Sequence, residues 1–164
     1  NLPFREIVRA DQILPFGEHA GMDFLVYIVE NSGVFSMLLD ALQQSNKVVP
    51  LLCLHGQMKT ASWALLDRLA ASGAVFLYSG DFDPEGLIIA QKLRQRYERV
   101  KLWHFSADEY QKTKNYLTEG RLKRLQGICD IELQPLVKLM QAWKCAFYQE
   151  SLIDILLEDV MLSY

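Results

Sequence analysis

The chain has 164 residues, of which 51% are hydrophobic and 23% are charged, and its formal net charge is −3. A chain of this length is typically one domain, and this composition excludes a disordered or a fibrous protein. Its apolar runs are too short to span a bilayer. No signal-peptide pattern opens the chain, so we expect a cytoplasmic segment of a longer protein with no membrane part.

The cysteines and histidines argue against a metal site built from thiolates or imidazoles. The three cysteines are widely spaced and form no C-x-x-C pair, and the three histidines show no ligand spacing. We therefore expect neither a disulfide framework nor a zinc ribbon, and a reducing compartment fits this cysteine usage.

The charges are unevenly distributed along the chain. Residues 1–91 carry a net charge of −5, residues 92–124 carry +6, and residues 125–164 carry −4. A basic block between two acidic ones is typical of a localised phosphate-binding surface. The alternative is an ordinary solvated helical face, which runs of lysine and arginine often form.

The first 22 residues contain two Pro-Phe pairs, and we expect them to be a lead-in or linker to a domain that spans residues 23–164. From residue 24 onward, continuous apolar runs alternate with helical patterns. The predicted strands are residues 24–29, 48–54, 74–78 and 100–105. The predicted helices between them begin near residues 34, 60 and 84.

Strands that are apolar on both faces and alternate with helices predict a parallel sheet with helices on both faces. Right-handed crossovers then place the carboxyl ends of all strands at one edge. After residue 106 the alternation stops, and helices are predicted at residues 116–126, 133–146 and 150–162. The predicted fold class is therefore α/β, with about four parallel strands and a helical C-terminal extension.

Three carboxylates stand where two of the predicted strands end. Glu30 follows the first strand, and Asp81 and Asp83 follow the third strand in the run Gly-Asp-Phe-Asp-Pro-Glu-Gly. If these strands are neighbours, the three acids meet at the edge where parallel sheets bind ligands. Clustered carboxylates repel one another unless a cation is present, and oxygen ligands select Mg²⁺, Ca²⁺ or Mn²⁺ over zinc. The pattern predicts a site for a hard divalent cation.

Two of these acids also have a structural interpretation. Asp83 precedes a proline, which is the form of a helix N-cap followed by proline at the first helical position. Glu30 could be a strand-end residue that reaches solvent. Asp81 is harder to explain in this way, because a cap needs only one aspartate.

The sequence around these acids resembles a known family. The segments Val29-Glu30-Asn31, His55-Gly56-Gln57 and Gly80–Ala90 are similar to a Toprim domain, the magnesium-binding module of topoisomerases, bacterial primases and overcoming-lysogenization-defect nucleases. The D-x-D-P-x-G-L form is closest to the topoisomerase VI A subunit. The stretch from residue 22 to 162, with its Tyr148–Leu152 segment, resembles the C-terminal domain of the D component of Wadjet plasmid-defence systems and its uncharacterised bacterial relatives.

This resemblance implies a Toprim-like (Rossmann-like) fold and a Mg²⁺-dependent endonuclease or nickase, with Mn²⁺ as the other candidate metal. Asp81 and Asp83 would hold the metal, and Glu30 would be the general acid/base or a ligand of a second metal. A divalent ion neutralises charge at the phosphorus and activates water, and a nearby glutamate can move the proton. The implied partners are DNA, bound through residues 92–124, and an SMC-like ATPase complex.

Four further polar residues are weaker candidates for the site. Glu85 is either another acid of the site or a favourable charge in the first turn of a helix. Gln57 could touch phosphate, or it could be an ordinary polar turn residue. Gln149 and Glu150 could belong to the site or only start a helix. No winged-helix pattern precedes residue 22, so we do not expect strand passage by this chain alone.

Two other functions remain open at this point. A haloacid-dehalogenase-type phosphatase also carries D-x-D after an apolar strand, but there the first aspartate is a nucleophile on the first strand. A non-catalytic Toprim-like module would bind DNA or a partner through the basic segment and the C-terminal helices. The intact set of three acids argues against such a module, because clustered carboxylates without a function destabilise a fold.

Overall fold

A computed structural model of the chain describes residues 24–56 and 58–162. The expected lead-in, residues 1–22, and the candidate Gln57 lie outside the described residues. Within the described part, no helix is both long and apolar enough to cross a membrane.

The centre of the fold is a four-stranded parallel sheet in the order β2-β1-β3-β4. This arrangement confirms the predicted α/β class, and it meets the condition that the first and third strands be neighbours. The two central strands, β1 and β3, are mostly buried because helices cover both of their faces. The strands are β1 (Leu25–Val29), β2 (Leu51–Cys53), β3 (Val75–Ser79) and β4 (Val100–Leu102).

The two outer strands are shorter than the sequence pattern predicted. Apolar runs were expected to form strands over residues 48–54 and 100–105, but only three residues of each are strand. An outer strand pairs on one side only, so its ends separate from the sheet more readily than those of a central strand. One backbone hydrogen bond beyond each outer strand continues its pairing with the neighbouring strand. Leu54 N donates to Val29 O at 3.0 Å, and Trp103 N donates to Tyr78 O at 2.8 Å.

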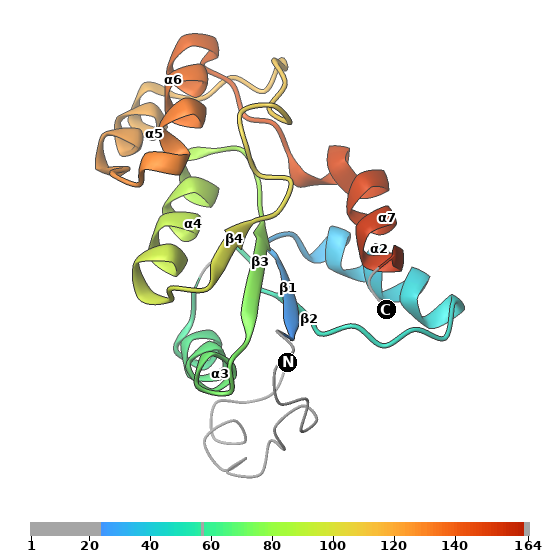
Figure 1. The fold of residues 1–164 in the computed structure, drawn as a ribbon. Helices are drawn as coiled ribbons and strands as arrows, with labels where there is room; N and C mark the ends of the chain where they lie inside the picture. Colours follow the sequence, from blue (N-terminus) through green and yellow to red (C-terminus); the bar gives the residue numbers. More distant parts are fainter. Residues whose placement is uncertain (1–23, 57, 163–164) are drawn as a thin grey trace.

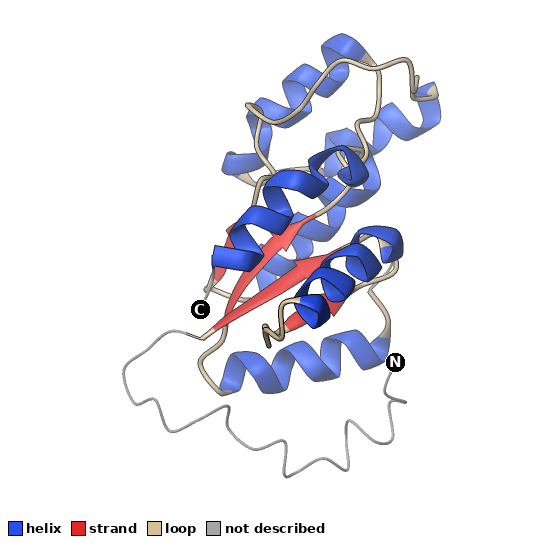
Figure 2. Ribbon diagram, turned by 90° about the vertical axis from the view of Figure 1, so that its right-hand side faces the viewer, coloured by secondary structure: helices blue, strands red, loops and turns tan. Residues whose placement is uncertain are grey.

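Helices cover the sheet on both faces, as the crossovers require. In Figure 1, α3 (Thr60–Ala71) and α4 (Pro84–Arg96) lie on one side of the sheet, and α2 (Ser32–Gln44) lies on the other. The view in Figure 2 looks onto the sheet from the side of α2. Asn31 caps α2, because its Oδ1 accepts from Gly33 N at 2.7 Å.

The C-terminal part is helical, but its helices are shorter than predicted. The expected helix over residues 116–126 is a five-residue α-helix that continues as a 3₁₀ turn, and the expected helix over 133–146 ends at residue 143. Lys144 stops the latter helix because its backbone is left-handed, with φ of 53°. The elements are α5 (Glu119–Lys123), η1 (Arg124–Gly127), η2 (Ile131–Leu133), α6 (Gln134–Trp143), η3 (Gln149–Leu152) and α7 (Ile153–Leu162).

The segment after α6 returns to the sheet and pairs with the loop that follows β3. Phe82 N donates to Phe147 O at 2.8 Å, and Phe147 N donates to Phe82 O at 3.1 Å. The chain then continues into α7, which lies beside α2 (Figure 1). The loop between Asp81 and Asp83 is therefore held by residues more than sixty positions away in the sequence.

An aromatic cluster anchors this loop in the core. The Phe82 side chain is fully buried, and its ring lies 4.8 Å from that of Phe105, 5.4 Å from that of Phe147 and 5.8 Å from that of Tyr110, between ring centres. Aromatic pairs at these spacings contribute roughly 0.5–1.5 kcal/mol each beyond the burial of their surface. Because Phe82 separates Asp81 from Asp83, its burial fixes the position of both aspartates.

Gly86, in the first turn of α4, packs directly against this loop. A Cβ atom at position 86 would lie 2.0 Å from the backbone oxygen of Asp81, and backbone cannot move aside as a flexible side chain can. We expect Gly86→Ala to lower the free energy of unfolding by roughly 2–3 kcal/mol, the upper range of overpacking costs. Urea denaturation measures this change.

Gly120→Ala is the matched control, because a Cβ at position 120 meets nothing within 4 Å and alanine is favoured in a helix. A Gly86→Ala protein as stable as the Gly120→Ala protein would contradict the close approach.

Candidate metal centre

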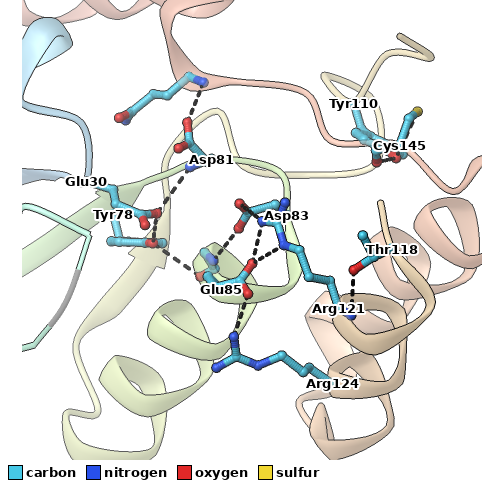
Figure 3. Close-up of polar contacts among 12 residues, drawn as sticks. Glu30, Tyr78, Asp81, Asp83, Glu85, Tyr110, Thr118, Arg121, Arg124 and Cys145 are labelled. Atoms are coloured by element: carbon cyan, nitrogen blue, oxygen red, sulfur yellow. Dashed lines mark hydrogen bonds and ion pairs between the residues drawn. The ribbon is translucent and has the colours of Figure 1, made fainter. Parts of the chain in front are cut away.

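The pairing of β1 with β3 brings Glu30 and Asp81 together. Val29 lies opposite Ser79 in the parallel register, so the residues that follow each strand emerge side by side. The backbone N–H of Asp81 donates to Glu30 Oε2 at 3.3 Å (Figure 3). Both side chains therefore lie at the carboxyl edge of the sheet, where ligands bind in folds of this class.

Glu30 is buried, with 7% of its surface exposed, so the interpretation that it reaches solvent is wrong. The Tyr78 hydroxyl, itself fully buried, lies 3.3 Å from Glu30 Oε2 and 3.2 Å from the Gly86 carbonyl oxygen and shares its one hydrogen between them. A Cβ at position 80 would lie 2.8 Å from Glu30 Oε2. The carboxylate thus sits in a cradle that leaves no space for a side chain at position 80.

The environment of Glu30 disfavours its charged form. Burial, and then the charges of Asp81 and Asp83, raise the pKa of Glu30 to about 7. Burial raises the pKa of Asp81 to about 6, and the neighbouring charge of Asp83 adds to this effect. Two acids whose pKa values lie this close to neutrality can hold or release a proton under physiological conditions.

Asp81 is oriented by the C-terminal segment. Its Oδ1 accepts from the backbone N–H of Gln149 at 2.8 Å. The Gln149 side chain is fully buried, and its Oε1 accepts from Asn31 N at 3.2 Å. Glu150 lies beside it, with Oε1 accepting from Asn31 Nδ2 at 2.8 Å. The structure therefore brings Gln149 and Glu150 to the edge that Glu30 and Asp81 form.

Asp83 has two structural contacts in this structure. Its Oδ1 accepts from Gly86 N at 2.8 Å, which confirms the N-cap interpretation, and its Oδ2 lies 2.5 Å from an Nη atom of Arg121. Burial raises the pKa of Asp83, while the Gly86 hydrogen bond and the charge of Arg121 oppose this rise. Asp83 as a metal ligand therefore stays a prediction, and any ligand would share this carboxylate with Arg121.

Glu85 belongs to the same network of charges. Arg121 and Arg124 both form ion pairs with its carboxylate (Figure 3). Burial alone would raise the pKa of Glu85, but the hydrogen bonds and charge of Arg121 outweigh burial and lower it. Glu85 is thus an ionised partner of two arginines at the side of the site.

The sequence pattern did not predict the roles of two residues that contribute to the site, Tyr78 and Arg121. Tyr78 is the residue of β3 that donates to Glu30, and its place three residues before Asp81 was the only signal. Arg121 was counted only as one charge of the basic segment, although it lies against Asp83 from 38 positions away. No local pattern connects residues so distant in the sequence.

A pocket of about 280 Å³ opens beside Glu30 and Asp81. Its other lining residues are Asn31, Ser32, His55 and Gly56. Among the described residues, no three His, Cys, Asp or Glu side chains stand in the arrangement of a preformed metal site. Magnesium often binds through one or two carboxylates and completes its shell with waters and substrate phosphates, so two acids beside a pocket fit such an ion.

Much of the positive charge in residues 92–124 is neutralised within the fold. Arg94 pairs with Asp130 at 2.6 Å, and Arg96 pairs with Asp67 at 2.7 Å. Arg121 and Arg124 pair with the acids described above. The lysines of the segment are therefore its main remaining source of positive charge, and DNA binding through it stays a prediction.

The raised pKa of Glu30 predicts how stability depends on pH when no metal is bound. Because the folded-state pKa of about 7 lies above the ordinary 4.5, the folded state binds more protons between these values. The contribution of Glu30 to the free energy of unfolding should therefore be highest below about pH 4.5 and fall by on the order of 3 kcal/mol as the pH rises through 7. Urea denaturation in EDTA at about pH 5 and pH 8 measures this difference.

Glu30→Gln should remove the share of this pH dependence that Glu30 contributes, because glutamine keeps the shape and cannot titrate, and should leave the smaller share that the raised pKa of Asp81 contributes. Asp40→Asn, at an exposed position of α2, is the control and should keep it. An equal pH dependence in both variants would show that Glu30 is not the responsible group.

Comparison with known proteins adds one result to this geometry. No curated protein matches the chain. The family described as "Protein of unknown function C-terminus (DUF2399)" matches residues 1–160, which is nearly the whole length. The chain therefore belongs to the DUF2399 family.

Proposed function

We propose that this chain is a Toprim-type domain that cleaves phosphodiester bonds of DNA in a Mg²⁺-dependent reaction. The observation that carries the proposal is the contact between Glu30 and Asp81 beside a pocket at the carboxyl edge of a parallel sheet. Both acids have raised pKa values, which is typical of catalytic and metal-binding carboxylates.

In this proposal, the aspartates bind the metal ion and Glu30 transfers the proton. A bound magnesium ion would neutralise charge on the phosphate and lower the pKa of a coordinated water. Asp81, fixed by the Gln149 N–H, would bind the ion, and Asp83 would join it on exchange of its Arg121 contact. Glu30, with a pKa of about 7, is suited to take the proton from the attacking water and to return it to the departing oxygen.

DNA is the substrate that fits the charges around this edge. Lys92 is exposed, and Arg121 and Arg124 are half-buried or exposed at the side of the acids. Cations around an acidic metal site hold the phosphate backbone close while the metal offsets the negative charge of the acids. The resemblance of residues 22–162 to the Wadjet D component supports a place for this activity in plasmid defence, together with an SMC-like ATPase complex.

A second candidate function is a non-catalytic module that binds DNA or a partner. The observation in its favour is the Asp83–Arg121 ion pair, which neutralises one of the three acids without a metal. In that case Arg121 would be a permanent structural counterion, and the acidic edge would never take up a divalent ion.

Nicking of supercoiled plasmid with Mg²⁺ or Mn²⁺ tests the proposal. We expect Asp81→Asn and Glu30→Gln to lower the nicking rate at least about 100-fold, because each removes metal binding or proton transfer. Asp40→Asn, an exposed carboxylate on α2, should leave the rate unchanged. Activity that survives both site variants would overturn the proposal, and phosphate release from a small monoester would favour the phosphatase instead.

Thermal unfolding with and without Mg²⁺ tests metal binding independently of cleavage. At an ion concentration about tenfold above the dissociation constant, binding to the folded state adds roughly 1.4 kcal/mol of stability. We expect this gain at about pH 8, where Glu30 and Asp81 are ionised, and its loss in Asp81→Asn. A wild-type protein that is not stabilised by Mg²⁺ or Mn²⁺ would favour the non-catalytic module.

A further inference from the structure

A second pocket, also of about 280 Å³, lies next to the acidic one. The two pockets share Gly56 as a lining residue, and the second also includes Glu85 of the arginine network. The remaining lining residues are Met58, Trp63, Ile88, Ile89, Lys92 and Arg124. Lys92 and Arg124 already belong to the basic segment proposed to bind DNA, whereas Met58, Trp63, Ile88 and Ile89 have no role in the proposed function.

The lining of this second pocket combines an aromatic ring, aliphatic side chains and two cations. The half-buried indole of Trp63 has the guanidinium of Arg96 5.0 Å from its ring centre. Lys92 is exposed and has no ion pair with another described residue. Arg124 is 53% exposed even though it pairs with Glu85, so its guanidinium also has room for a ligand.

We propose that this pocket holds one nucleotide of the DNA strand beside the phosphodiester that is cleaved, an inference that rests on the proposed function. The base would pack on Trp63 and the neighbouring aliphatic side chains, and its phosphate would contact Lys92 and Arg124. Aromatic platforms flanked by cations bind single-stranded nucleic acid in this way, because every base has an apolar face and every linkage has a charge. The volume is close to the lower limit of about 300 Å³ for small-ligand pockets, which suits one nucleotide.

The connection between the two pockets favours a strand over a free nucleotide. His55 and Gly56 form a turn in which both residues have positive φ, 51° and 70°. The atom nearest to a Cβ at position 56 would be Glu30 Oε1, at 3.9 Å. Glycine at position 56 adds no side chain of its own between the pockets, which favours passage of a sugar-phosphate backbone from Glu30 toward Trp63.

A base can reach such a pocket only when it is unstacked, so the substrate is single-stranded or locally opened at this nucleotide. The inference therefore narrows the substrate class from DNA in general to DNA with at least one unpaired nucleotide next to the cleaved bond.

Fluorescence anisotropy with a labelled oligothymidylate in EDTA measures this binding without cleavage. We expect Trp63→Leu and Lys92→Gln each to weaken the affinity at least about fivefold, the lower end of base-stacking effects. The control variants Met37→Ala and Lys138→Gln change an exposed apolar residue of α2 and an exposed lysine of α6, both outside the pocket and outside residues 92–124, and they should bind as the wild type does.

An oligonucleotide with abasic sites separates the contribution of base stacking to the affinity from that of the phosphate charge. Trp63→Leu should not weaken binding of the abasic strand, whereas Lys92→Gln should weaken binding of both strands. Trp63 also contacts Tyr97, so Trp63→Leu could disturb the packing of α3 as well as the pocket. Lys92→Gln removes only a surface charge, and it therefore tests the pocket without this disturbance.

The inference is overturned if the wild type does not bind the oligomer, or if Trp63→Leu and Lys92→Gln bind it as tightly as the wild type. Failure of the proposed function is a different result. In that case the two pocket variants would lose affinity as expected, while the wild type would not nick plasmid or Asp81→Asn would nick equally well.

Discussion

The parallel contact between β1 and β3 determines where charge is placed in this molecule. It sets Val29 opposite Ser79, so the residues that follow the two strands lie together in a small volume at the end of the sheet. That volume holds the buried carboxylate of Glu30, the Tyr78 hydroxyl and the backbone of Asp81. A fold that buries a carboxylate next to two aspartates loses stability unless protons or cations compensate. A bound divalent cation, as in the proposed function, would relieve this repulsion.

Under the proposed function, two kinds of cation would meet at this edge. Arg121 reaches Asp83 and Glu85 from α5, and a divalent ion would approach Glu30 and Asp81 from the acidic pocket. The arginine stabilises the aspartate that lies farther from the pocket, whereas no basic side chain forms an ion pair with Glu30 or Asp81 among the described residues. The fold thus neutralises one end of the acidic set itself, and in the proposed function a divalent ion would neutralise the other end. This division would reconcile the helix-cap role of Asp83 with the proposed metal role of Glu30 and Asp81.

The sequence predicted the parts of this site that depend on local pattern. Continuous apolar runs identified the strands, and the geometry of parallel sheets then placed Glu30 and Asp81 at one edge. The contributions of Arg121 and Gln149 could not be predicted with the same certainty, because each reaches an aspartate over a long separation in sequence. The early end of α6 was missed for a related reason. Lys144 leaves the helix with a left-handed backbone, and the following residues pair with Phe82, a contact that no local preference encodes.

The return of the chain to Phe82 also has a consequence for biosynthesis. Among residues 24–56 and 58–162, the aspartate loop pairs with Phe147, and the Asp81 side chain accepts a backbone hydrogen bond from Gln149. While a ribosome is still translating the segment before them, the sheet can form but its acidic edge lacks these supports. In a nascent chain, the carboxylates at the end of the sheet would therefore repel one another without these contacts. The arrangement of Glu30 and Asp81 would be completed only after the sheet has formed and residues 147–149 have been synthesised.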